Sequence, residues 1–149
     1  MSGDAKSKSD LAVDCFKSGF NCSQSVFTAF SGDAGLDSDT ALKVATAFGG
    51  GIASTGSVCG AVSGGLMAIG LKYGRCTIED LKAKEKTYEL SRQFMNEFKA
   101  RHGSVICKEI LGCDLNTPEG KAEFNSKNLI NVTCAGCVRD SVQILEKLL

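Results

Sequence analysis

Eight cysteines stand in this chain of 149 residues, and four of them closely follow residues that commonly cap helix N-termini. These four, with their predicted caps, are Cys22 after Asn21, Cys59 after Ser57, Cys107 after Ser104 and Cys134 after Thr133. A helix N-terminus presents unpaired N–H groups and about half a unit of positive charge, so it favours a thiolate over a thiol. We therefore predict that Cys22, Cys59, Cys107 and Cys134, the four-cysteine set, act as redox thiols or as metal ligands.

The intervals within the four-cysteine set are long, so tertiary packing, not one loop, has to assemble any shared site. The chain contains neither the two close cysteine pairs of a zinc ribbon nor the closely spaced run of a bacterial ferredoxin. Only Cys134 and Cys137 have CxxC spacing, and no strand pattern precedes them as it would in a thioredoxin-like motif. Cys113 and Cys137 lie near members of the set, so we predict them as resolving thiols or alternate ligands. We expect Cys15 and Cys76 to be ordinary small apolar residues.

The segment from Gly49 to Gly65, GGGIASTGSVCGAVSGG, surrounds Cys59 with glycines. Such a backbone can direct N–H groups at a sulfur or a cofactor, so Gly60 and Gly64 are candidate cofactor-binding positions. Glycine and alanine at every fourth position equally suit close packing between helices, and that alternative stays open. The segment lacks the GK[ST] sequence and the preceding strand of a phosphate-binding loop.

The elements that have to position the cysteines are predicted to be helices. Caps, glycine stops and apolar periodicity predict helices over 10–17, 21–30, 37–48, 58–73, 77–101 and 104–111, another after Thr117, and a last one from Thr133 or Cys134. We predict an all-α fold, a compact bundle of six to eight helices in which a glycine-rich loop leads into a central helix. Residues 1–9 are expected to form a flexible lead, and 10–149 a single domain.

The charge balance and the hydropathy pattern exclude several partners. Lysines plus arginines equal aspartates plus glutamates at 17 each, which argues against nucleic acid or an anionic membrane as a partner. The uncharged run from Val44 to Leu71 is rich in glycine, serine and threonine, so we predict a buried helix and its loop, not a membrane span. Because the N-terminus is polar, we expect a cytoplasmic protein, in which cysteines are seldom permanent disulfides.

His102 is the single histidine, and it stands at the end of the longest predicted helix. We expect its imidazolium to interact with the last carbonyl groups of that helix. A nucleophilic Cys–His pair is the less favoured alternative.

Several stretches resemble a known family. They are Asn21–Val26 (NCSQSV), Cys59–Gly64 (CGAVSG), Gly70–Gly74 (GLKYG), Cys107–Gly112 (CKEILG) and Cys134. They are similar to the C_GCAxxG_C_C family, whose members are described as redox-active, and the similarity extends from about residue 10 to residue 149. The resemblance implies an all-helical domain with four characteristic cysteines, which correspond here to the four-cysteine set.

Three functions are open at this point. In the first, the four thiolates hold an iron–sulfur cluster for electron transfer, with a redox partner protein or a small-molecule electron donor or acceptor. In the second, no cofactor is present, and one thiol attacks a disulfide or a peroxide before a neighbour resolves it. In the third, four thiolates hold a structural zinc ion. We favour the first because dithiol exchange needs only two cysteines. A homodimer is a further expectation, because glycine-rich helix faces can pack against a second copy.

Overall fold

The computed structural model describes residues 5–149, and over this range the protein is all-α, as predicted. Eight α-helices follow one another: α1 (Lys8–Lys17), α2 (Cys22–Ser31), α3 (Ser38–Ala45), α4 (Gly60–Tyr73), α5 (Leu81–His102), α6 (Cys107–Leu111), α7 (Pro118–Ser126) and α8 (Ala135–Leu148). Short 3-10 helices η1 (Gly32–Ala34) and η2 (Thr46–Phe48) and a π-helix η3 (Ile130–Cys134) complete them. The described residues form no strand, and one isolated antiparallel bridge joins Val58 to Ile106.

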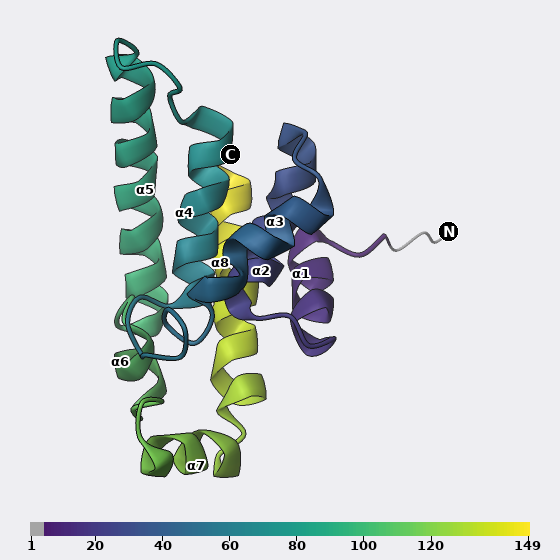
Figure 1. Cartoon of the computed structure of the whole chain (residues 1–149), viewed down its shortest axis with the longest axis vertical. Coiled ribbons are helices and arrows are strands. Elements are labelled where there is room, and N and C mark those ends of the chain that lie inside the picture. Colours follow the sequence, from purple (N-terminus) through teal and green to yellow (C-terminus); the bar gives the residue numbers. More distant parts are fainter. Residues whose placement is uncertain (1–4) are drawn as a thin grey trace.

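Helix α4 lies at the centre of the bundle, as expected for the glycine-rich segment. It packs most extensively on α2 and also contacts α5 and α8, while α1 packs on α8. Figure 1 shows α5 running alongside α4, and α6 and α7 gathered at one end of the molecule. The core between these helices contains the fully buried side chains of Phe94, Phe98, Ile69, Val138 and Leu145.

The small residues of α4 let neighbouring helices come very close. A Cβ atom built on Gly64 would lie 2.6 Å from the carbonyl oxygen of Ser23 in α2. A Cβ atom on Gly65 would collide with the ring of Phe94 in α5. Glycine at these two positions therefore sets the separation of α4 from both neighbours.

Several predicted boundaries are corrected. α1 begins at Lys8, with Ser7 as its N-cap, so the helix takes in two residues of the predicted lead; residues 1–4 of that lead lie outside the described range. The longest helix begins at Leu81 and not at Thr77, because Asp80 caps it by accepting a hydrogen bond from the N–H of Ala83. None of the helices in residues 5–149 combines the length and the apolar character that crossing a bilayer requires.

Candidate functional site

The four-cysteine set, whose members are far apart in sequence, lines a single cavity of about 390 Å³. Cys22 is the first residue of α2, Cys59 immediately precedes α4, Cys107 is the first residue of α6, and Cys134 ends η3. Cys137, in the first turn of α8, lines the same cavity as a fifth cysteine, and all five are free thiols. Tertiary packing thus brings together residues that no local motif connects.

The cavity reaches the molecular surface while its sulfurs stay recessed. Phe20 and Ile130 belong to its lining and are 42% and 43% exposed. Cys59 and Cys107, in contrast, are only 6% and 7% exposed. A small molecule can therefore enter from the rim, whereas a protein partner would contact the rim and not the sulfurs.

A capping box fixes Cys22 at the start of α2, and this confirms Asn21 as its predicted cap. The Oδ1 atom of Asn21 accepts a hydrogen bond from the N–H of Gln24 (2.9 Å), and the N–H of Asn21 donates to Oε1 of Gln24 (3.0 Å). The Nδ2 atom of Asn21 also donates to the carbonyl oxygen of Thr46 at 2.9 Å. The capping box therefore closes the first turn of α2, and the bond to Thr46 ties the start of that turn to η2.

Two backbone hydrogen bonds place Cys59 beside Cys107. The N–H of Cys59 donates to the carbonyl oxygen of Val105 (2.8 Å), and the N–H of Cys107 donates to that of Ser57 (2.6 Å). These bonds flank the isolated antiparallel bridge. Because both cysteines are tied through their own backbone, their separation is set by the bridge and not by flexible loops.

The bridge also explains why two predicted caps are wrong. Ser57 does not cap α4, because residues 57–59 pair with residues 105–107 and the helix begins only at Gly60, with Cys59 in the N-cap position. Ser104 does not cap α6, whose N-cap position is Ile106. Instead, Oγ of Ser104 accepts from the N–H of Ile106 (2.9 Å) and donates to Glu109 (2.7 Å).

The fourth predicted cap, Thr133, is also wrong, since Cys134 does not stand at a free helix N-terminus. η3 begins at Ile130 and continues directly into α8, so Cys134 has helical backbone on both sides. Cys134 and Cys137 are three residues apart at the junction between η3 and α8, and both line the cavity. The π-helical turn, and not a capping residue, therefore positions Cys134.

A left-handed turn forms part of the cavity wall. Five successive residues, from Gly50 to Ser54, have φ between 51° and 70°, and they include the β-branched Ile52 at 68°. This conformation costs an L-residue about 1–2 kcal/mol. A Cβ atom on Gly51 would lie 2.5 Å from Cβ of Cys107, so only glycine lets this backbone approach the cysteine. The sequence predicted the loop but not its handedness.

The pKa of Cys59 lies below the ordinary thiol value of 9.0. The largest cause is a hydrogen bond from the thiol of Cys137. Backbone N–H groups of Ala61 and Val62, in the first turn of α4, lower this pKa further. Together these donors lower the pKa by more than burial raises it. At Cys59 the pKa moves in the direction predicted for a helix N-terminus, but the thiol of Cys137 and not the helix is the largest cause.

The same prediction is wrong for Cys22 and Cys107. The pKa of Cys22 is raised well above 9.0, chiefly because its thiol is hydrogen-bonded to Cys134 and also because it is buried. Burial, followed by the charge of the neighbouring sulfurs, raises the pKa of Cys107 to about 12. The pKa of Cys137 is likewise raised, first by its hydrogen bond to Cys59 and then by burial. At these cysteines, burial and the neighbouring sulfurs thus raise the pKa by more than the helix dipole lowers it.

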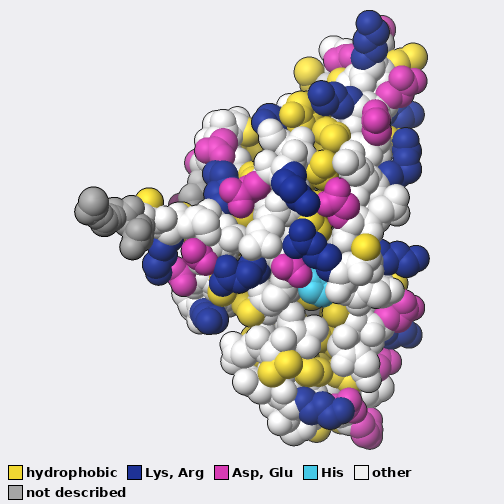
Figure 2. All heavy atoms as spheres, turned by 180° about the vertical axis from the view of Figure 1, so that it is seen from behind, with side chains coloured by type: hydrophobic (Ala, Val, Ile, Leu, Met, Phe, Trp, Pro, Cys, Tyr) yellow, Lys and Arg dark blue, Asp and Glu magenta, His cyan; other side chains and the backbone are white. Residues whose placement is uncertain are grey.

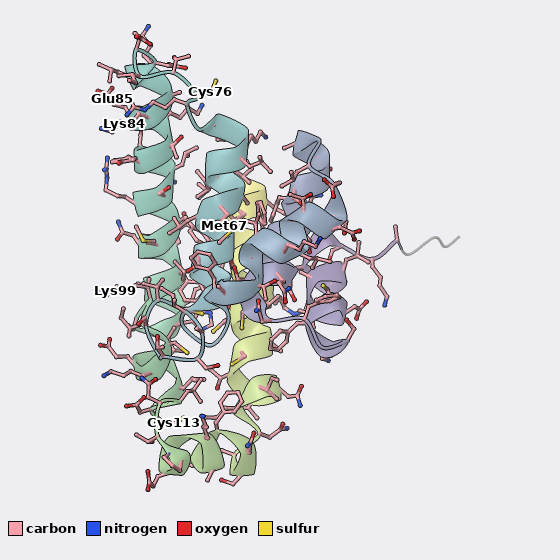
Figure 3. The ribbon with its side chains drawn as sticks, viewed as in Figure 1. Met67, Cys76, Lys84, Glu85, Lys99 and Cys113 are labelled. Atoms are coloured by element: carbon pink, nitrogen blue, oxygen red, sulfur yellow. The ribbon has the colours of Figure 1, made fainter. Side chains whose placement is uncertain are left out.

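The remaining cysteines do not line the cavity. Cys113 is buried next to it, in a small apolar cluster that also contains Cys107 and the lining residues Leu111 and Leu115. Cys76 is exposed, and Cys15 is half-buried in α1. Figure 3 shows Cys76 by the connection between α4 and α5 and Cys113 beside α7, at opposite ends of the molecule.

The two candidate backbone positions, Gly60 and Gly64, have different surroundings. Gly60 lines the cavity, and a Cβ atom there would lie 3.1 Å from Cβ of Cys22. Gly64 does not belong to the lining and instead contacts the backbone of Ser23. Close packing thus accounts for Gly64, whereas Gly60 combines packing with a place beside the sulfurs.

His102 and Asp140 lie next to Cys137 outside the cavity lining, and the sequence analysis did not single out Asp140. The Nδ1 atom of His102 lies 3.8 Å from Sγ of Cys137, and its Nε2 atom lies 2.9 Å from Oδ2 of Asp140. The favoured prediction for His102 is an interaction with the carbonyls that end α5, and its contact with Cys137 corresponds to the less favoured Cys–His pair. The three-residue spacing of Cys137 and Asp140 on α8 was a visible signal, but only the packing of α5 on α8 brings His102 to it.

The thiols surround the cavity without closing on one point. Within residues 5–149, no three or more His, Cys, Asp or Glu side chains are grouped so that they could hold a metal ion as they stand. Lys121 is the one lysine, arginine, aspartate or glutamate among the described residues that line the cavity. The lining thus combines five sulfurs, apolar side chains and one cation.

Comparison with known proteins gives one match. The family model described as "Putative redox-active protein (C_GCAxxG_C_C)" matches residues 20–148, a range that contains all five cysteines of the cavity. Neither the curated proteins nor the solved structures yield a match to the chain.

Proposed function

Because the chain belongs to the C_GCAxxG_C_C family, which is described as redox-active, we propose that the four-cysteine set binds an iron–sulfur centre and that the protein transfers electrons through it. The observation that carries the proposal is the convergence of four sequence-distant cysteines on one cavity. Four cysteine thiolates are the usual ligand set of [2Fe–2S] and [4Fe–4S] clusters. Reversible dithiol chemistry needs two thiols and leaves such a convergence unexplained.

The donors of the cavity are of the type that such a centre uses, and the thiols would have to draw together to bind it. A cavity of about 390 Å³ lined by four thiols has room for a group larger than a single ion. The pKa of Cys59 is lowered from the ordinary thiol value, whereas the pKa values of Cys22 and Cys107 are raised. Ligation must therefore release protons from these two residues, so binding is favoured as the pH rises.

Fixed dipoles of this chain would tune the potential of the bound group. The N–H groups of Ala61 and Val62 help to lower the pKa of Cys59, and Lys121 supplies a positive charge at the rim. Donors and positive charge stabilise the reduced, more negative state, so both raise the reduction potential. The centre would carry electrons, and these residues would set the energy at which it accepts them.

Electron exchange would take place at the rim of the cavity. Phe20 and Ile130 are exposed there and form an apolar edge next to recessed cysteines. A redox protein or a small electron carrier would approach this edge. A homodimer stays part of the proposal, although the helix faces of Gly64 and Gly65 are occupied within the chain.

The proposal is tested by assaying iron, acid-labile sulfide and zinc in anaerobically purified protein, together with its visible absorption spectrum. Equal amounts of iron and sulfide, near two or four per chain, are expected. Cys59→Ser should lose both, whereas the matched variant Cys76→Ser, which changes an exposed cysteine outside the cavity, should keep them. Stoichiometric zinc without iron, or unchanged iron and absorption in Cys59→Ser, would overturn the assignment.

A further inference from the structure

Helix α7 contributes three residues and no cysteine to the lining of the cavity. These residues are Lys121, Phe124 and Asn125, and their spacing of three and four positions places them on one face of the helix. That face brings an ammonium group, an aromatic ring and a side-chain amide to the same space. The cavity therefore has a wall whose chemistry differs from that of the sulfurs.

The polar groups of this wall lack partners within residues 5–149. Lys121 makes no ion pair there, and the side chains of Lys121 and Asn125 make no hydrogen bond. Gly51 also lines the cavity and is buried, and its backbone N–H donates to no backbone carbonyl of the described chain. A cation and a buried N–H donor both favour an acceptor that carries negative charge.

Much of the remaining lining is apolar. Four apolar side chains line the cavity behind its exposed rim of Phe20 and Ile130: Phe16, Ile110, Leu111 and Leu115. Figure 2 shows hydrophobic side chains at the lower end of the molecule, the end at which Figure 1 places α7. Since a cavity of about 150 Å³ holds a benzene molecule, about 390 Å³ has room for roughly fifteen non-hydrogen atoms. The cavity can thus enclose a small organic molecule with an apolar body.

The charge of the lining selects the polar group of such a molecule. Lys121 is the one lysine, arginine, aspartate or glutamate among the described lining residues, so it can balance a single negative charge. A phosphate dianion would keep an unpaired charge in largely apolar surroundings, which is unfavourable. A carboxylate carries one charge, and its two oxygens can accept from both an ammonium group and an amide.

A second cavity, of about 340 Å³, is a poorer site for an anion. Its lining contains as many acidic residues as lysines. These residues are Lys8, Lys72, Asp33 and Glu146. Nζ of Lys8 lies 2.7 Å from Oδ2 of Asp33, and Nζ of Lys72 donates to the carbonyl oxygen of Leu149 at 3.0 Å. Because these lysines already have acceptors, an anion gains less from them than from Lys121.

We propose that the cysteine-lined cavity binds a small organic monocarboxylate with an aliphatic or aromatic body. The carboxylate lies against Lys121 and Asn125, and the body lies among the apolar side chains. Because Lys121 is exposed, the carboxylate stays at the mouth of the cavity, away from negative charge on the recessed sulfurs. The proposal goes beyond iron–sulfur binding and does not rest on it, because none of the groups that carry it is a cysteine.

The first test titrates the full-length protein, as purified, with hydrocinnamate and separately with hydrocinnamyl alcohol by isothermal titration calorimetry. The two compounds share a phenylpropyl body, and only the first carries a charge. Hydrocinnamate should bind at least about tenfold more tightly, because charge-assisted hydrogen bonds hold its carboxylate. Equal affinities, tighter binding of the alcohol, or no binding of either compound would overturn the proposal.

The second test repeats the titrations in three variants of exposed lysines. Lys121→Gln should reduce the preference for hydrocinnamate to less than about twofold, because it removes the charge and keeps an amide. Lys127→Gln should keep the preference, since Lys127 is paired with Glu123 at 3.0 Å and does not line the cavity. Lys72→Gln, in the second cavity, should also keep it. Loss of the preference in Lys72→Gln but not in Lys121→Gln would place the anion in the second cavity and contradict the proposal.

Iron and acid-labile sulfide are measured in the same samples, so that the two proposals are tested separately. Lys121→Gln should contain as much of both as the wild type, because Lys121 is not a proposed ligand. A lost preference for hydrocinnamate at unchanged iron supports the carboxylate site. Wild-type protein that lacks iron and still prefers hydrocinnamate would overturn the iron–sulfur centre and leave the carboxylate site supported. Circular dichroism checks that each variant is folded.

Discussion

The hydroxyl of Ser141 donates a 2.8 Å hydrogen bond to the carbonyl oxygen of Ala61, and both residues are fully buried. Ser141 is on α8, one turn after Cys137, and Ala61 follows Cys59 in the first turn of α4. This bond thus ties the start of α4, directly after Cys59, to the part of α8 that follows Cys137.

Ser141→Ala should lower the free energy of unfolding by about 1–3 kcal/mol, because it removes a buried hydrogen bond that the carbonyl of Ala61 cannot replace with water. Urea denaturation measures the change. Ser126→Ala is the matched control, since Ser126 bonds its own helix at an exposed position and should change stability by less than about 0.5 kcal/mol. Equal effects from the two variants would show that the α4–α8 bond is energetically unimportant.

Gly64→Ala should destabilise the protein by about 1–3 kcal/mol or more, because the new methyl group would overlap the backbone of Ser23 and push α2 from α4. Gly70 offers a control on the same helix, since a Cβ atom there meets nothing within 4 Å. Gly70→Ala should stabilise by up to about 1 kcal/mol through helix propensity alone. Thermal unfolding of both variants checks the opposite signs, and a neutral Gly64→Ala would contradict the packing assigned to α4.

Alkylation should distinguish the five thiols of the cavity. In reduced, metal-depleted protein near pH 8, iodoacetamide should modify Cys59 faster than Cys107, because hydrogen bonds lower the pKa of Cys59 and burial raises that of Cys107 to about 12. Peptide mass spectrometry at a series of times measures both rates. Exposed Cys76 serves as the reference for unhindered access. Faster reaction at Cys107 than at Cys59 would contradict the assigned order.

Alkaline pH should lower the free energy of unfolding of the reduced, metal-depleted protein because of Cys107. Its pKa is raised from 9.0 in the unfolded chain to about 12 in the fold, so between these values the unfolded chain loses a proton that the folded chain retains. The contribution of Cys107 to stability is therefore full below pH 9 and declines as the pH rises towards 12. Urea denaturation of the wild type and of Cys107→Ser should show a difference in unfolding free energy that shrinks over this window. A difference that grows over this window would contradict the raised pKa assigned to Cys107 in the folded protein.

Ile52→Gly should stabilise the protein by about 1 kcal/mol, because Ile52 holds φ at 68°, where a β-branched side chain is strained and glycine is not. Ile52 is 39% exposed, so little buried surface is lost. Val44→Gly, at an exposed position of α3, should instead cost about 1 kcal/mol, which separates relief of strain from a general effect of glycine. Chemical denaturation of the two variants provides the comparison.

The sequence by itself determined the all-α class, the order of the helices and the identity of four cysteines of the cavity. These follow from local physics: Asn21 caps α2 through contacts within four residues, and the apolar stripe of α8 repeats with the helical period. The close approach of α4 to its neighbours was visible in the spacing of Gly60 and Gly64 for the same reason.

Only the tertiary structure decided which sulfurs meet and which of them ionise. Cys59 sits beside Cys107 because of a bridge between segments nearly fifty positions apart, and His102 reaches Cys137 because α5 packs on α8. The helix dipole predicted a thiolate at each cysteine of the set, but burial and neighbouring sulfurs reversed the direction at Cys22 and Cys107. Charge interactions depend on distances in space and on exclusion of water, and neither quantity is encoded in the local pattern of the chain.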